Sequence, residues 1–120
     1  MLVLIVDNSI QIIERLEEII GELESTAVVH GALSYEEAKK LLKEYNHDIV
    51  LLDIDLPGDQ SLKLLAEIRM TGKETYVIVL FNYTDNYMIE KCKYYGVDFF
   101  IDKYYDFEKL YRLSNLHHLL

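Results

Sequence analysis

The chain has 120 residues, of which 51% are apolar and 28% are charged, a composition typical of one globular domain spanning residues 1–120. Its net charge is −9 and it has no basic cluster, so it lacks the cationic side chains that displace counterions from phosphates, which excludes nucleic acid as an expected partner. The longest apolar run, residues 1–6, is too short to span a membrane, and the single Cys92 cannot form an internal disulfide, so we expect a cytosolic protein.

The first half of the chain alternates apolar segments with segments of helical periodicity. Residues 2–6 show no polar alternation, which is typical of a strand buried on both faces. A helical stripe follows from Asn8, which resembles a capping pair with Gln11, and residues 27–30 form a short strand. The capping box Ser34-Tyr35-Glu36-Glu37 opens a second helix. An apolar strand over residues 48–53 then leads to a turn at Pro57-Gly58.

The second half continues the alternation. It is predicted to contain a helix from about Ser61 to a stop at Gly72, a strand over 76–81, a helix over 84–95 ended by Gly96, a strand over 97–101 and a last helix capped by Asp106. Five apolar strands alternating with five helices predict an α/β fold, a doubly wound parallel sheet with helices on both faces. Such sheets bind ligands beyond the carboxyl ends of their strands, where the strand order reverses.

Charged side chains stand at the ends of three predicted strands. Asp7 follows the first, Asp53 ends the third, and Lys103 stands with Asp102 at the end of the fifth, so Asp7, Asp53 and Lys103 should converge at one edge of the sheet. Clustered carboxylates repel one another and attract a hard divalent cation, for which Mg²⁺ is the usual choice. A carboxylate flanked by a metal and an ammonium can attack a phosphoryl group, which makes Asp53 the candidate nucleophile.

Three segments at the right mutual distances carry a family resemblance. They are Leu4-Ile5-Val6-Asp7, the segment from Asp48 to Gly58 (DIVLLDIDLPG), and the segment from Gly96 to Lys103 (GVDFFIDK). Together they resemble the receiver domain of response regulators in two-component signalling, a chemotaxis-regulator-like fold, over essentially the whole chain. The resemblance implies a flavodoxin-like sheet with the strand order 2-1-3-4-5.

The resemblance also implies a mechanism. Asp53 would accept a phosphoryl group from a histidine kinase or a histidine phosphotransfer protein, and Lys103 would pair with that group. Asp7, Asp53 and the backbone carbonyl of Asp55 would contribute to the Mg²⁺ site, and Phe100 would be the aromatic residue that turns inward on activation. The helix over 84–95, the strand over 97–101 and the last helix would form the output face, toward a downstream protein or a second copy. No output domain is present within the 120 residues, and the domain itself would not be an enzyme.

Three positions depart from the family pattern. Asn8 replaces the second acidic residue after the first strand, which keeps an oxygen ligand and weakens the metal site. Phe81 replaces the hydroxyl residue at the end of the fourth strand, and it either fills space beside Asp53 or packs into the core. Asn82 would be a replacement donor if that strand ended one residue later. Tyr104 replaces the proline after the lysine, so we expect a trans Lys103–Tyr104 peptide bond.

These departures leave two main hypotheses open, a phosphorylated receiver and a degenerate receiver that binds partners without phosphorylation. A third, a phosphatase of the haloacid-dehalogenase type, shares only the Asp53-x-Asp55 pattern. Tyr87, Tyr94, Tyr104 and Tyr105 form a candidate aromatic interface, in which Tyr87 and Tyr94 lie outside the apolar stripe of their helix. Of the histidines, His30 has no assigned role, and His47, His117 and His118 are expected to be solvated.

Overall fold

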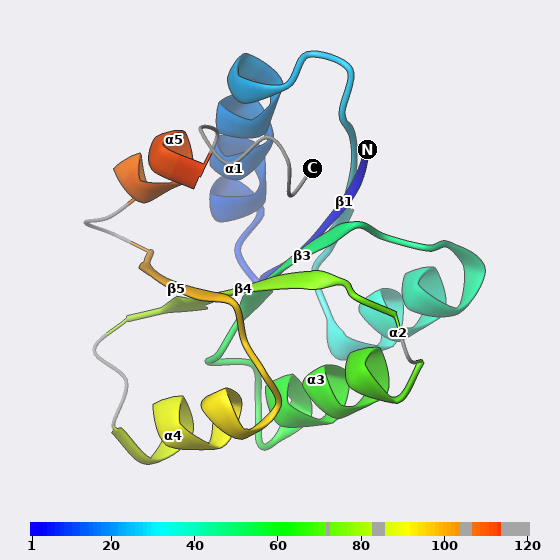
Figure 1. Cartoon of the computed structure of the whole chain (residues 1–120), viewed down its shortest axis with the longest axis vertical. Helices are drawn as coiled ribbons and strands as arrows, with labels where there is room; N and C mark the ends of the chain where they lie inside the picture. Colours follow the sequence, from blue (N-terminus) through cyan, green and yellow to red (C-terminus); the bar gives the residue numbers. More distant parts are fainter. Residues whose placement is uncertain (72, 83–85, 104–106, 114–120) are drawn as a thin grey trace.

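The computed structural model describes residues 1–71, 73–82, 86–103 and 107–113. For residues 111–113 it describes the backbone only. It contains a five-stranded parallel sheet in the order β2-β1-β3-β4-β5, as predicted (Figure 1). The strands are β1 (Leu2–Val6), β2 (Val28–Ala32), β3 (Ile49–Asp53), β4 (Tyr76–Phe81) and β5 (Phe99–Asp102). The helices are α1 (Ile10–Leu23), α2 (Tyr35–Glu44), α3 (Gln60–Met70), α4 (Asn86–Tyr94) and α5 (Glu108–Leu113).

The sheet separates two apolar layers. Helices α1 and α5 cover one face of it, and α2, α3 and α4 cover the other (Figure 1). All five residues of β3 are buried, and its side chains alternate between the layers, with Leu51 in the α1 layer and Leu52 in the α2–α4 layer. Burial on both faces explains why the strands carry no polar alternation in the sequence.

The helix starts show where sequence patterns are decisive and where they are not. Ser34 caps α2 as predicted, because its hydroxyl accepts from Glu37 N at 3.2 Å. The predicted Asn8 cap of α1 is wrong: Ser9 is the cap, with extended backbone, and its hydroxyl accepts from Ile12 N at 3.4 Å. Either residue type suits this position, so the choice depends on the backbone that follows β1. The predicted helix stop at Gly72 and cap at Asp106 lie outside the described residues.

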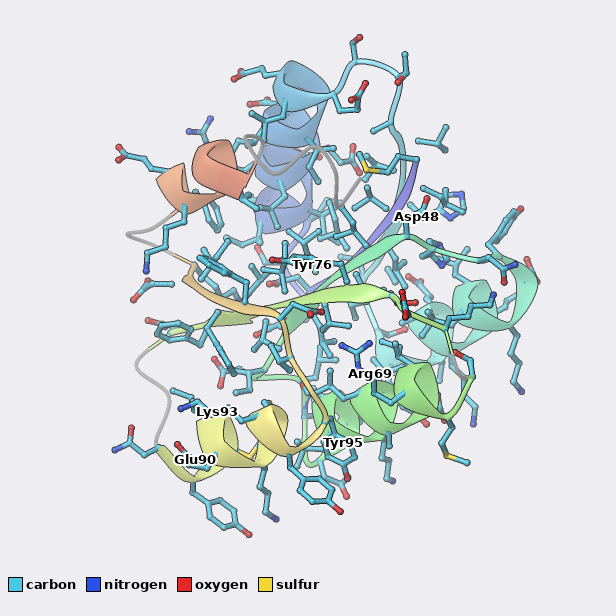
Figure 2. All side chains as sticks on the ribbon, in the orientation of Figure 1. Asp48, Arg69, Tyr76, Glu90, Lys93 and Tyr95 are labelled. Carbon is cyan, nitrogen blue, oxygen red and sulfur yellow. The ribbon has the colours of Figure 1, made fainter. Side chains whose placement is uncertain are left out.

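One arginine joins α3 to the end of α4 and to the start of β4. The Arg69 guanidinium donates to the carbonyls of Thr75, Tyr95 and Gly96 at 2.7, 2.8 and 2.6 Å, and its Nη2 lies 3.3 Å from Asp98 Oδ2 (Figure 2). Asp98 Oδ2 also accepts from Val77 N at 2.7 Å. A planar guanidinium with five donors can satisfy carbonyls in several directions at once, which an ammonium cannot match.

We therefore expect Arg69→Lys to lower the free energy of unfolding by about 2 kcal/mol, because charge-assisted bonds to three carbonyls are lost or weakened. Urea unfolding at neutral pH measures this. The control is Arg15→Ala, since Arg15 only approaches Glu18 at 3.7 Å on the exposed side of α1 and such pairs stabilise little. Equal stability of Arg69→Lys and the unchanged chain would contradict the structural role of Arg69.

Within the described ranges, none of the helices has both the length and the apolar character needed to cross a lipid bilayer.

Candidate functional site

Asp7, Asp53 and Lys103 meet at the carboxyl edge of the sheet, as the sequence predicts. Lys103 Nζ lies 2.9 Å from Asp7 Oδ2 and 3.2 Å from Asp53 Oδ2. Asp7 follows β1 and Asp53 ends the neighbouring β3, whereas Lys103 follows β5, two strands away from β3. The Lys103 backbone N–H donates to Phe81 O at 2.8 Å, so the β4–β5 pairing continues to Lys103 and its long side chain reaches across β4.

This cluster is buried and carries one more negative charge than positive. Asp7, Asp53 and Lys103 are 0%, 1% and 8% exposed. Burial is the main cause that raises the pKa of Asp53 and the nearby Asp7 charge adds to it, while the Asp55 backbone N–H and Lys103 oppose the rise. Burial lowers the pKa of Lys103, but its contacts with Asp7 and Asp53 outweigh burial and raise it. A second cation would relieve the excess negative charge.

The oxygens of the two carboxylates are not equally engaged. Asp7 Oδ1 accepts from Ser9 N and Asp53 Oδ1 from Asp55 N, both at 2.9 Å. Asp7 Oδ2 is buried and forms the ion pair with Lys103, but the contact falls outside hydrogen-bond geometry and this oxygen has no hydrogen-bond partner among the described residues. An oxygen of this kind retains lone pairs for a further cation.

The donor set fits Mg²⁺ better than a metal that needs a full protein cage. The described ranges contain no group of three or more His, Cys, Asp or Glu side chains that could hold a metal. Mg²⁺ normally uses one or two carboxylates and keeps several waters, and Asp7 and Asp53 provide two. Asn8 directly follows Asp7, and Asp55 comes two residues after Asp53, but both side chains are exposed. Neither side chain adds a third buried oxygen to the cluster.

Phe81 packs against the core. Phe81 and Phe100 are both half-buried against the apolar cluster between the sheet and helices α2–α4. Phe81 is paired with Asp102, and Val79 with Phe100, so the two phenylalanines are diagonal neighbours on adjacent strands. Of the two interpretations of Phe81, core packing is therefore the one that the structure supports. β4 ends at Phe81, so the shift that would place Asn82 at the strand end does not occur.

The predicted tyrosine interface is described only in part. Tyr87 and Tyr94 are 64% and 86% exposed on α4, whereas Cys92 is buried and Met88, Ile89 and Tyr95 pack against the core, as the helical stripe predicts. The exposed rings border a hollow that also includes Leu62 of α3. Tyr104, Tyr105 and the Lys103–Tyr104 peptide bond lie outside the described residues.

Sequence reasoning misjudged two buried polar residues. His47, expected to be solvated, is 5% exposed, and its Nε2 lies 3.0 Å from His30 Nδ1 at the opposite end of the sheet from Asp53. In the sequence, the charged Asp48 separates His47 from the apolar run that follows, so the burial of His47 was not evident. Ser61 is 1% exposed and its hydroxyl contacts the Asp53 carbonyl. Ser61 stands in register with the buried Leu64, Leu65 and Ile68, and a polar residue at an apolar stripe position could have indicated this contact.

Comparisons with known proteins show the family of the chain. The family model of the response regulator receiver domain matches residues 3–115. The chain belongs to this family. The receiver domain is 30% identical to the transcriptional regulatory protein MalR of Bacillus subtilis over 107 residues, which are 89% of this chain and 46% of MalR. It thus spans about half the length of the curated relatives it matches.

Solved structures show the same fold. The response regulator TrrA from Thermotoga maritima, determined in complex with Mg²⁺ and beryllofluoride, is 30% identical with a TM-score of 0.79, covering 99% of this receiver domain and 98% of that chain. The signal receiver domain of the DNA-binding response regulator MerR from Colwellia psychrerythraea has a TM-score of 0.86 at 18% identity, covering 98% of each chain, and shows the fold alone.

Proposed function

We propose that residues 1–120 form one receiver domain that accepts a phosphoryl group on Asp53 from a histidine kinase or histidine phosphotransfer protein. The observation that supports this most is the buried cluster in which Asp53 Oδ2 lies 3.2 Å from Lys103 Nζ. Membership of the receiver family leaves the haloacid-dehalogenase alternative without support. The domain would act in signalling and not as an enzyme.

Asp53 has the chemistry of a nucleophile in this position. An oxygen of its carboxylate forms a new bond to phosphorus while the P–N bond to the donor's imidazole breaks, and the electron pair stays on that nitrogen, which takes a proton from water. The Lys103 ammonium neutralises charge on the transferred phosphoryl oxygens, and its contact with Asp7 Oδ2 holds it in place.

Mg²⁺ is the proposed cofactor. Asp7 and Asp53 would hold it with the backbone carbonyl of Asp55, and Asn8 would be a weaker ligand than a carboxylate. When bound, the metal supplies positive charge that stabilises the transferring phosphoryl group. Asp7 Oδ2 supports this assignment, because it accepts no hydrogen bond among the described residues and its ion pair with Lys103 leaves lone pairs for a metal.

The output would pass through α4, β5 and α5 to a downstream protein or a second copy. Exposed Tyr87 and Tyr94 on α4 support this face, and Tyr104 and Tyr105 are assigned to it from the sequence alone. Phe81, which has no hydroxyl, would link to Phe100 by packing, so Phe81 and Phe100 would form the switch without a hydroxyl contact to the phosphoryl group.

We expect one phosphoryl group to be added on incubation with acetyl phosphate and Mg²⁺, because Asp53 and Lys103 keep the arrangement that the transfer needs. Intact mass measures the uptake, and omission of Mg²⁺ is the control. Absence of uptake at any Mg²⁺ concentration would favour the second candidate, a degenerate receiver that binds its partners without phosphorylation. The observation that favours this second candidate is that Phe81 packs against the core at the position where the family has a hydroxyl residue.

A further inference from the structure

Ser61 is a buried hydroxyl residue in the first turn of α3. Its side chain is 1% exposed, and the side chains that share its helix face, Leu64, Leu65 and Ile68, are buried and apolar. The hydroxyl donates to the backbone carbonyl of Asp53 at 2.6 Å. A short hydrogen bond at a buried position is costly to lose, because its acceptor cannot turn to bulk solvent instead.

The Ser61 bond completes the fixation of Asp53. The Asp55 backbone N–H donates to Asp53 Oδ1, Lys103 Nζ pairs with Oδ2, and Ser61 binds the main-chain carbonyl. The first two contacts hold the carboxylate, whereas the Ser61 contact holds the peptide group that leads out of β3. It bridges the seven residues that lie between Asp53 and Ser61, which include Asp55.

The start of α3 has few other anchors. Asp59, at the cap position, makes no side-chain capping bond, and Gln60 N reaches Pro57 O only at 3.4 Å. Within the described residues, the Ser61 hydroxyl thus joins the first turn of α3 directly to the end of β3.

We propose that Ser61 is a positioning residue for phosphoryl transfer, which sets the place of Asp53 and of the Asp55 main chain relative to the metal; this rests on the function proposed above. Ser61 would touch neither the metal nor the phosphoryl group, because its hydroxyl is bound to the Asp53 carbonyl. It acts through the Asp53 peptide group, in the way that outer hydrogen-bond partners orient metal ligands. Loss of such partners commonly reduces metal affinity or activity by about 10–100-fold.

The test compares Ser61→Ala with Thr75→Val. Thr75 is a matched control, because it is 8% exposed and its hydroxyl also donates to a backbone carbonyl, that of His47 at 3.4 Å, at the opposite end of the sheet. Mg²⁺ is titrated into each ¹⁵N-labelled protein without a phosphodonor, and the rate of acetyl phosphate uptake is measured separately at several Mg²⁺ concentrations. Urea unfolding records the stability of each variant.

We expect Ser61→Ala to raise the Mg²⁺ concentration for half-saturation by about tenfold, in the titration and in the rate, whereas Thr75→Val leaves both unchanged. If Ser61→Ala does not fold, Ser61→Cys, which keeps the side-chain volume but donates weakly, carries the test. Unchanged half-saturation in a folded Ser61 variant would overturn the proposal. Absence of phosphoryl uptake by the unchanged chain would overturn the proposed function instead, while the titration still decides the role of Ser61.

Discussion

Asp53→Asn should abolish phosphoryl uptake from acetyl phosphate while the domain remains folded. The amide cannot form the acyl phosphate, so the variant lacks the proposed acceptor, whose Oδ2 lies 3.2 Å from Lys103 Nζ. Asp7→Asn is the control: it should keep the acceptor and shift the Mg²⁺ dependence to higher concentration. Intact mass after incubation measures both. Uptake by Asp53→Asn equal to that of the unchanged chain would place the acceptor elsewhere.

The same substitution should raise the melting temperature at pH 7 in the absence of Mg²⁺. Burial raises the pKa of Asp53 above its ordinary value, so the native state binds a proton more readily than the unfolded state does. The ionised Asp53 therefore costs stability, and this cost is present in full above the raised pKa and is lost as the pH falls below it. Asparagine removes the charge, whereas Lys103 keeps its 2.9 Å contact with Asp7. A lower melting temperature would show that the pair with Asp53 is net stabilising.

The second large effect is a loss of stability in acid that depends on His47. Burial is the main cause that lowers the pKa of His47 from 6.5 to about 4; His30 and Lys73 add to the fall, and Asp48 opposes it. Because the unfolded chain binds the proton more readily, the contribution of neutral His47 is complete above about pH 6.5 and is lost as the pH falls toward 4. The loss is on the order of 3 kcal/mol over this window.

Urea unfolding between pH 4 and pH 7 measures this effect when the unchanged chain is compared with His47→Phe. The substitution keeps a ring beside His30 and Tyr45, whose centroids lie 5.2 and 6.2 Å from that of His47, and removes the titration. Carboxylates titrate in both proteins, so their effect cancels in the difference. On acidification from pH 7 to pH 4, we expect the free energy of unfolding of His47→Phe to fall less than that of the unchanged chain, by about 3 kcal/mol. Parallel curves would contradict a buried neutral His47.

The fold could be predicted because the sheet is buried on both faces, so its strands are apolar without interruption. The three charged residues of the site could be predicted because each one ends or follows such a strand, and the carboxyl ends of parallel strands meet at one edge. Asp7, Asp53 and Lys103 are polar residues at positions where the apolar run stops, which is visible in the sequence.

The remaining features depend on contacts that sequence patterns do not contain. Phe81 faces the core because it shares the face of Val77 and Val79, but alternation alone does not decide which face carries the site. His47 lies in the segment before β3 and contacts His30, which is 17 residues away on β2. In the sequence, Ser61 is a residue type common at helix starts. Its contact with Asp53 arises from the packing of α3 against β3, which brings the hydroxyl to the Asp53 carbonyl.

The central claim is that Asp53 and Lys103 form one phosphoryl-accepting site with Mg²⁺. The most direct measurement is a ¹H–¹⁵N spectrum of the chain at saturating Mg²⁺ before and after addition of beryllofluoride, with Asp53→Asn measured in parallel. We predict large shifts at the amides of Asp53, Asp55 and Lys103 in the unchanged chain and none in Asp53→Asn. Identical spectra of the unchanged chain with and without beryllofluoride, at saturating Mg²⁺, would contradict the claim.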